Sequence, residues 1–356
     1  MQGVGIYFVE EDRMKKLRID ILCNDGSPLN TCLDDIYGKR NRIGLGGAEL
    51  ALHTVCEALH NSGHRVRLYN SPQTSGGSPY GQYPVDTFLP HEDRDILIIF
   101  RSPNHRSMEA KGRKIWWSCD QFTVGNFAEF APTVDKIITI SSYHANHFKT
   151  IYDIENTITI DLPVRMQDYE QTVRKIPHRM IYCSIPDRGL SILVSAYCRI
   201  QREVPDVSLS ITSDYRLWGV GDARNELYIR KFLTMDGVRF LGAIPRMDMV
   251  TEQLLADVQS YPCIYNELFC YSIAECQVAG AYPVTSSVGA VETTNMGTQV
   301  GGNPADPRWA DLYVSTVIDV MTNPHLKEMQ RDTQQLAKER FSLDKIMKKW
   351  DSVLYD

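Results

Sequence analysis

The sequence of 356 residues has nine cysteines but no two of them in a C-x-x-C arrangement. An odd, scattered set predicts neither a disulfide framework nor a zinc ribbon and is typical of a reducing compartment. No apolar run approaches the roughly 18 residues that a membrane-spanning helix needs. The first residues also lack the basic and long apolar regions of a signal peptide. We therefore expect a cytoplasmic protein, with peripheral membrane contact as the most that its surface would support.

An excess of positive charge is also lacking, because 38 Lys and Arg residues are outnumbered by 44 Asp and Glu residues. The resulting net charge of −6 provides no overall field that would attract nucleic acid. Low-complexity tracts and short-period repeats are absent as well. With 43% hydrophobic and 23% charged residues, the composition is that of a globular protein. Disordered, collagen-like and coiled-coil classes are therefore excluded.

The sequence does contain a regular alternation of short apolar runs and amphipathic helical patterns, which predicts an α/β fold with parallel sheets. The expected strands lie at residues 17–23, 64–70, 95–100, 114–119, 136–141, 178–184, 207–213, 238–244, 260–265 and 280–287. Because the pattern restarts in the second half, we predict two doubly wound sheets in series. The length suits two domains of about 150 residues or slightly more, with a cleft between them.

We predict an N-terminal domain at residues 1–162 and a second domain at residues 178–341, followed by a last helix at residues 342–356. The polar, proline-flanked stretch at residues 163–177 is expected to be the linker. Met14 resembles a natural start. Residues 1–13 are therefore expected to be a leader, with an extra edge strand as the alternative.

Open parallel sheets bind ligands beyond the carboxyl ends of their strands, so the loops there are the candidate sites. The first such loop contains Gly44, Gly46 and Gly47 just before a predicted helix. Glycines in this position let a phosphate or sugar approach the backbone amides, although a plain tight turn is the alternative. The nicotinamide-binding fingerprint is not met, because its third glycine and its ribose-binding acid are missing. A dehydrogenase is therefore disfavoured.

Two further loops carry charged residues. Arg188 stands at the start of a helix after the first strand of the second half, where a guanidinium could grip a diphosphate; a solvated pair with Asp187 is the alternative. Glu267 and Glu275 flank the start of another helix, and carboxylates accept hydrogen bonds from hydroxyl groups. Ser272 and Glu275 also fit a capping box, which would explain Glu275 without a ligand.

An anion-binding loop together with hydroxyl-accepting carboxylates describes a nucleotide-sugar site. Here the chain resembles the retaining glycosyltransferases of family 4, from about residue 17 to the end. The most specific motif is E-x7-E at Glu267 and Glu275 with its trailing AGAYPVTSSVGAVE. The segments GGAE, PDRGL, VRFLGAIPR and KERFSLDKIMKKW follow the expected order. The resemblance implies a GT-B fold, in which two Rossmann-like domains face a cleft and the last helix crosses back to the first domain.

The resemblance also implies the role of each site residue. Glu267 would hold sugar hydroxyls, Glu275 the donor ribose and Arg188 the diphosphate, while Asp120 would orient the acceptor. The other donor contacts would come from three loops. The loop of Gly46 and Gly47 would approach the diphosphate, the loop of Ala243 and Ile244 would lie against the base, and the amides of Gly289, Ala290 and Val291 would help to bind the donor. The expected catalytic residues are therefore Glu267, Arg188 and Asp120.

The implied reaction moves a sugar from a UDP- or GDP-linked donor, with retention, to an acceptor hydroxyl on a glycan, lipid, protein or modified base. No metal and no cofactor besides the donor are expected. Some residues depart from the family pattern. The region around Ser184 lacks the arginine that the family usually has in its phosphate loop, and Cys119 stands before Asp120 where many members have histidine. Two alternatives remain: another enzyme of this fold, such as an epimerase or phosphorylase, or a protein that binds nucleotide sugar without transferring it.

A basic run occurs in the first half of the chain. It consists of Arg101, His105, Arg106, Lys111, Arg113 and Lys114. Such a run could contact a phosphorylated acceptor or an anionic membrane surface. A solvated face is the alternative interpretation. The oligomeric state is left open by the sequence.

Overall fold

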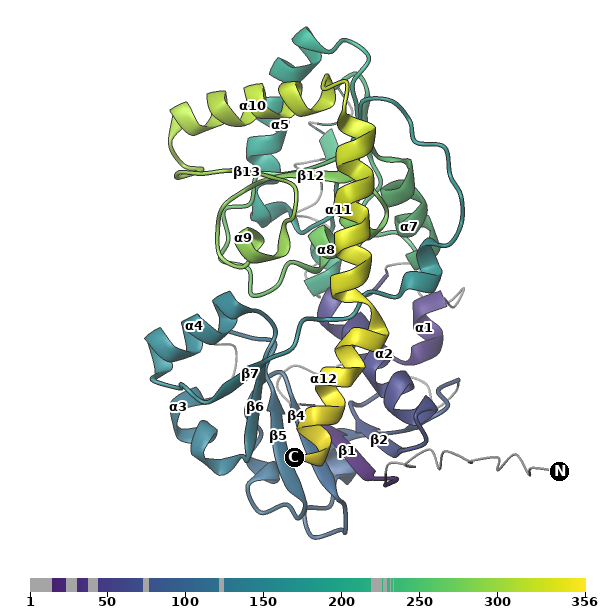
Figure 1. Ribbon diagram of the computed structural model, residues 1–356, viewed down its shortest axis with the longest axis vertical. Helices are drawn as coiled ribbons and strands as arrows, with labels where there is room; N and C mark the ends of the chain where they lie inside the picture. Colours follow the sequence, from purple (N-terminus) through teal and green to yellow (C-terminus); the bar gives the residue numbers. More distant parts are fainter. Residues whose placement is uncertain are drawn as a thin grey trace, which may run out of the picture.

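The computed structural model describes residues 15–23, 31–37, 44–72, 77–121, 125–218, 226, 229–230, 232 and 234–356. These residues build two parallel β-sheets with helices around them, one in each half of the chain, as Figure 1 shows. The predicted fold class, two doubly wound α/β domains of the GT-B type, is confirmed. No helix within the described ranges combines the length and the apolarity that crossing a membrane would take.

The first sheet has seven strands in the order β3-β2-β1-β4-β5-β6-β7, all paired in parallel. β4 is central, and all five residues of its sequence ILIIF are buried, as expected for a strand covered on both faces. The strands are β1 Arg18–Leu22, β2 Arg65–Tyr69, β3 Gly81–Tyr83, β4 Ile96–Phe100, β5 Arg113–Trp117, β6 Lys136–Thr139 and β7 Thr157–Thr159.

The second sheet repeats this winding with six strands in the order β10-β9-β8-β11-β12-β13. Its strands are β8 Arg179–Tyr182, β9 Ser208–Ile211, β10 Val238–Phe240, β11 Val258–Tyr261, β12 Tyr282–Ser286 and β13 Thr298–Val300. All neighbours are again parallel. In each sheet the chain winds first to one side and then to the other, which places a reversal between β1 and β4 and between β8 and β11.

Helices lie between many of these strands and also follow the last one. They are α1 Leu33–Tyr37, α2 Gly47–Asn61, α3 Phe127–Phe130, α4 Ser142–Tyr152, α5 Leu190–Glu203, α7 Arg246–Leu255, α8 Tyr271–Val278, α9 Val291–Thr294, α10 Pro307–Met321, α11 Leu326–Phe341 and α12 Leu343–Tyr355. Short 3-10 turns include η4 Met166–Tyr169, in the predicted linker, and η5 Pro186–Arg188, after β8.

The last two helices pass from one half of the molecule to the other. In Figure 1, α11 runs beside the second sheet and α12 continues down beside the first. α12 buries Ile346, Trp350, Val353 and Leu354, which lie on one face at helical spacing. Trp350 meets Trp117 of β5 edge to face, with ring centroids 5.0 Å apart. The end of the chain therefore packs in the core of the first sheet.

The two halves also share apolar and ionic contacts. Phe269 and Phe341 belong to the same buried cluster as the residues of the first sheet. In addition, the guanidinium of Arg340 in α11 donates to both carboxylate oxygens of Asp161, which follows β7, at 2.9 Å. Such a bidentate pair fixes the relative orientation of the two groups, which apolar packing alone does not do.

Two strand predictions need correction. The strand expected at residues 260–265 is β11, Val258–Tyr261, because Pro262 has no amide to donate to a neighbouring strand. The edge strands β3, β7 and β13 were not among the expected strands, because each has only three residues and is too short to show a period.

α4 shows how a polar residue is placed in the core. The side chain of Ser141 caps the helix by accepting from the amide of His144, and the same hydroxyl donates to the Leu268 carbonyl of the other half at 2.5 Å. His144 is fully buried, and its ring meets Phe148 edge to face. Burial lowers the pKa of His144 to about 3, with a smaller contribution from neighbouring His147.

We expect His144→Gln to flatten the pH dependence of stability between pH 7 and pH 5. The native imidazole stays neutral until about pH 3, whereas the unfolded imidazole takes up a proton near pH 6.5. The unfolded state therefore binds more protons, and the wild type loses stability as the pH falls below 6.5, by about 2 kcal/mol at pH 5. Melting temperatures at both pH values test this. The exposed His91→Gln should keep the wild-type slope, and an unchanged slope in His144→Gln contradicts the prediction.

We also expect Gly189→Ala to lower the melting temperature by several degrees. Gly189 has a φ of +117°, and a Cβ atom there would lie 2.0 Å from the Pro262 carbonyl oxygen. Backbone strain and overpacking together cost about 2 to 4 kcal/mol. Gly301→Ala is the control, because nothing lies within 4 Å of its Cβ position. Calorimetric scans that show equal melting temperatures for both variants would contradict the prediction.

Candidate functional site

The candidate site forms where the second sheet reverses its winding. β8 and β11 are neighbours there, and the chain leaves them toward opposite sides, so helices leave the edge between their carboxyl ends open. Arg188 follows β8 in the turn η5, and Glu267 follows β11. Gly189 lets these two loops touch, because only a residue without Cβ fits against Pro262.

Arg188 and Glu267 form an ion pair at this edge. The Arg188 Nε atom lies 3.4 Å from Glu267 Oε1, and the two side chains are 13% and 19% exposed. The Arg188 guanidinium also lies over the Tyr265 ring. Tyr261 donates its hydroxyl to Glu267 Oε1 at 3.0 Å. A cation and a carboxylate are thus held together in a partly desolvated niche.

Burial raises the pKa of Glu267 above its usual range, and the nearby Arg188 and Tyr261 limit the shift. Tyr261 is itself held from the other side, since Ser184 Oγ lies 3.2 Å from its hydroxyl. Ser184 and Tyr261 thus form a neutral hydroxyl network beside Glu267.

The loop that contains Gly289 packs directly against the chain before Glu267. Gly289 has a φ of +59°, and a Cβ atom would lie 2.7 Å from Asn266 Cα. The Ala290 amide donates to the Glu267 carbonyl at 2.7 Å, and the Val291 amide to the Val288 carbonyl at 3.2 Å. Two of the three predicted ligand amides are therefore already used within the chain, and that of Ala290 holds the backbone of Glu267.

The glycine loop of the first half approaches the second half closely. A Cβ atom at Gly47, the first residue of α2, would lie 2.5 Å from Tyr271 Cβ of α8. A Cβ atom at Gly44 would lie 2.8 Å from the Ile244 carbonyl oxygen. Gly46 is the residue before α2. The structure thus brings the predicted glycine loop next to Ile244 and the start of α8.

Ala243, the neighbour of Ile244, is held by a buried acid. Its amide donates to Asp214 Oδ2 at 3.1 Å, and Asp214 is 1% exposed. This contact fixes the backbone of the loop after β10 before any ligand is present.

Asp120 belongs to the first half of the molecule, where it follows β5. Its carboxylate accepts from the Gln121 amide at 2.7 Å and from the Ser102 hydroxyl at 3.3 Å. The Gln121 side chain in turn donates to the carbonyl of Asn266, the residue before Glu267. Asp120 and Glu267 are therefore carried by two loops, one from each half, that contact each other.

The basic run predicted from the sequence does not form one patch. Lys111 pairs at the surface with Asp93 at 2.8 Å, whereas Arg113 donates to the Val353 carbonyl of α12. Arg101 contacts helix α2 instead. Its Nη2 atom donates to Glu49 Oε1 of α2 at 2.7 Å, and its φ of +70° is rare outside glycine. Its position directly after β4 is the sequence signal that marks it as a site residue.

The capping-box prediction for Ser272 and Glu275 is wrong. α8 begins at Tyr271, and its cap residue is Cys270, which has a φ of 56° and no side-chain cap. Ser272 therefore lies inside the first turn. Glu275 bonds Arg246 and Gln253 instead of a backbone amide. Glu275 belongs to a second polar cluster, distinct from the pair of Arg188 and Glu267.

No group of three or more His, Cys, Asp and Glu side chains in the described part of the chain could hold a metal ion. All nine cysteines are free thiols. The functional groups at the edge of β8 and β11 are thus a guanidinium, carboxylates, hydroxyls and backbone amides.

Known proteins support the fold. No family model and no curated protein matches the chain in sequence. A glycosyltransferase from Rickettsia africae is 14% identical with a TM-score of 0.70, over 95% of this chain and 98% of that one. Sucrose-phosphate synthase from Thermosynechococcus elongatus is also 14% identical with a TM-score of 0.70, over 94% and 98%. HepE of Anabaena, solved in complex with UDP-glucose, is 14% identical with a TM-score of 0.69, over 95% and 99%. The chain therefore has the GT-B fold of these glycosyltransferases.

Proposed function

We propose that this protein is a retaining glycosyltransferase, which moves a sugar from a UDP- or GDP-linked donor to an acceptor hydroxyl without a metal. The observation that carries the proposal is the pair of Arg188 and Glu267 at the edge of β8 and β11, opposite the loop of Asp120. A cation and a hydroxyl acceptor side by side suit the junction of diphosphate and sugar. The UDP-glucose complex of HepE, a protein of the same fold, supports a nucleotide-sugar donor.

In the proposed complex the residues at the edge and in the facing loops have separate tasks. Arg188 binds the diphosphate, Glu267 accepts from sugar hydroxyls, and the loop of Ala243 and Ile244 lies against the base. Asp120 orients the acceptor hydroxyl. Gly46 and Gly47 let the backbone of the first half approach the donor. The raised pKa of Glu267 fits this role, because a hydroxyl donor compensates a buried carboxylate.

The reaction then proceeds on one face of the sugar. The acceptor oxygen forms a bond to the anomeric carbon while the bond from that carbon to the phosphate oxygen breaks. The acceptor proton passes to the departing diphosphate, so no further base is needed. Arg188 stabilises the negative charge that develops on the leaving group, and the rate enhancement comes from positioning and electrostatics.

Release of nucleotide diphosphate tests the function. The protein is incubated with UDP- and GDP-sugars and with glycan, lipid, protein and modified-base acceptors, and free UDP or GDP is measured. Acceptor-dependent release supports a glycosyltransferase. Conversion of the donor without an acceptor supports an epimerase, and release with phosphate as the only acceptor supports a phosphorylase. Donor binding with neither outcome supports a binding protein that does not transfer sugar.

We expect Arg188→Ala to weaken UDP or GDP binding by roughly tenfold to a hundredfold, the usual range for losing a hydrogen bond to a charged group. Binding of the nucleoside should change little, because it carries no phosphate. Calorimetry on both ligands tests this. Arg199→Ala on α5 is the control, since Arg199 pairs at the surface with Asp311. Equal weakening of nucleotide and nucleoside would assign Arg188 a structural role.

We expect Glu267→Gln to reduce sugar transfer by about a hundredfold while leaving the affinity for free UDP or GDP within about threefold, because free nucleotide lacks the sugar that Glu267 contacts. Transfer rate and nucleotide affinity are measured on the same preparation. Glu292→Gln is the control, because Glu292 is an exposed acid at the start of α9, just after the loop that contains Gly289. Full transfer by Glu267→Gln would remove this carboxylate from the mechanism.

A further inference from the structure

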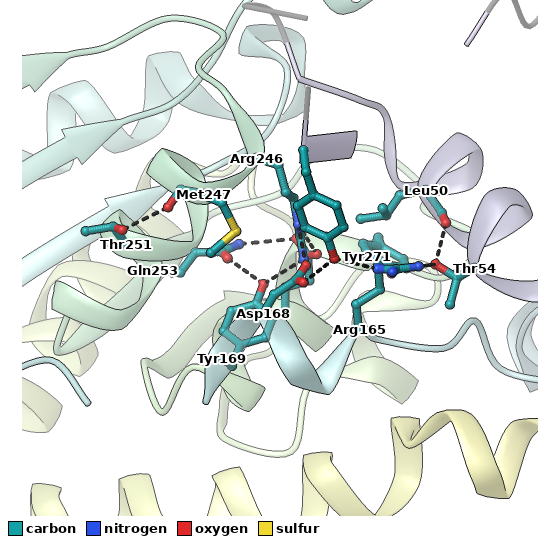
Figure 2. A network of polar contacts seen from close by, with 12 residues as sticks. Leu50, Thr54, Arg165, Asp168, Tyr169, Arg246, Met247, Thr251, Gln253 and Tyr271 are labelled. Carbon is teal, nitrogen blue, oxygen red and sulfur yellow. Dashed lines mark hydrogen bonds and ion pairs between the residues drawn. The ribbon is translucent and has the colours of Figure 1, made fainter. Parts of the chain in front are cut away.

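A buried ionic cluster joins the two halves of the molecule beside the candidate site. Arg246, the first residue of α7, donates its Nε to Asp168 Oδ2 at 2.9 Å and its Nη1 to Glu275 Oε1 at 2.5 Å. The three residues are 9%, 4% and 6% exposed. Figure 2 shows Arg246, Asp168 and Tyr169 gathered around one point. One guanidinium thus links an acid of the predicted linker to the second acid of the E-x7-E motif.

The orientation of Glu275 is fixed from both sides. Arg246 occupies Oε1, and the side-chain amide of Gln253 donates to Oε2 at 3.3 Å. Gln253 cannot turn freely, because its own oxygen accepts from the Tyr169 hydroxyl at 2.7 Å. A carboxylate offers about four lone-pair positions, so two remain for further donors. The vicinal hydroxyl groups of a ribose are donors of the matching number.

The cluster continues into the first half. Tyr37 of α1 donates its hydroxyl to Asp168 Oδ1. Arg165 donates to the Tyr37 hydroxyl at 2.8 Å and to Glu57 of α2 at 2.8 Å. Asp168 is therefore bonded by Arg246 from the second half and by Tyr37 from the first. Arg246, which orients Glu275, is connected in this way to helices α1 and α2 of the first half.

The buried carboxylate of Glu275 needs the positive charge of Arg246. A carboxylate buried without a positive partner is costly, and it takes up a proton or turns toward water. Among the described residues, Arg246 is the cation that pairs with Glu275, since Gln253 is neutral. Without Arg246, Glu275 would lose its counter-ion and its fixed direction, and with them a correctly aimed hydroxyl acceptor would be lost.

We propose that Arg246 is the positioning residue for ribose recognition: it is the counter-ion of Glu275 and keeps its carboxylate aimed at the ribose hydroxyls, and Asp168 anchors Arg246 to the segment between the domains. The inference rests on the proposed function, because it assumes a nucleotide donor. It predicts that discrimination between ribose and deoxyribose depends on Arg246, which contacts Glu275 and not the ligand.

The test compares affinities for UDP and 2′-deoxy-UDP, or for the guanosine pair if the protein prefers GDP, by calorimetry on the whole chain. We expect the wild type to prefer the ribonucleotide by roughly tenfold or more. Arg246→Met should bring this ratio near one, and Arg246→Lys should restore part of it, because lysine keeps the charge without the planar fork. The preference for nucleotide over nucleoside, which belongs to Arg188, should survive in both variants.

Arg239→Met is the matched control, since Arg239 bonds Glu252 of the same helix α7 at 3.2 Å. Its ratio should equal that of the wild type. If Arg246→Met does not fold, Asp168→Asn replaces it, because it removes the anchor while keeping the shape, and its ratio should also fall. An unchanged ratio in a folded variant of either kind overturns the inference. Failure of the wild type to bind any nucleotide diphosphate overturns the proposed function itself, and this inference with it.

Discussion

The site depends on the reversal of winding between β8 and β11. Parallel strands whose connections leave toward opposite sides keep one edge open, and Arg188 and Glu267 enter that edge from the two strands. Close packing of the two loops makes the pair possible, because Gly189 has no Cβ to displace Pro262. The contacts proposed for the diphosphate and the sugar follow from this meeting of two strand ends.

The other half of the molecule completes the geometry through contacts with main-chain atoms. Ser141 donates to the Leu268 carbonyl at 2.5 Å, and Tyr271 donates to the Pro163 carbonyl at 2.6 Å. These carbonyls flank Glu267 or lie in the predicted linker, and buried carbonyls need such partners. The position of Glu267 is thus set by both halves together, which ties the chemistry at one sheet to the arrangement of the two domains.

Much of the fold was predictable because parallel α/β proteins show strong local patterns. Buried strands such as β4 appear as continuous apolar runs, and the order of the runs predicts which loops share an edge. The adjacency of Arg188 and Glu267 could be predicted in this way. The end of β11 could have been predicted from Pro262, whereas the three-residue edge strands β3 and β13 carry no period to detect.

The sequence by itself determined the two-sheet architecture and the loops in which the charged residues lie, because periodicity and proline or glycine positions act over a few residues. Only the tertiary structure decided which partners these residues have. Ser272 and Glu275 fit a capping box locally, yet Glu275 bonds Arg246, which lies 29 positions earlier in the chain. Arg101 belongs to a basic run, yet it pairs with Glu49, 52 positions away. Ion pairs and hydrogen bonds act over a few ångströms in space, and distance along the chain does not encode that proximity.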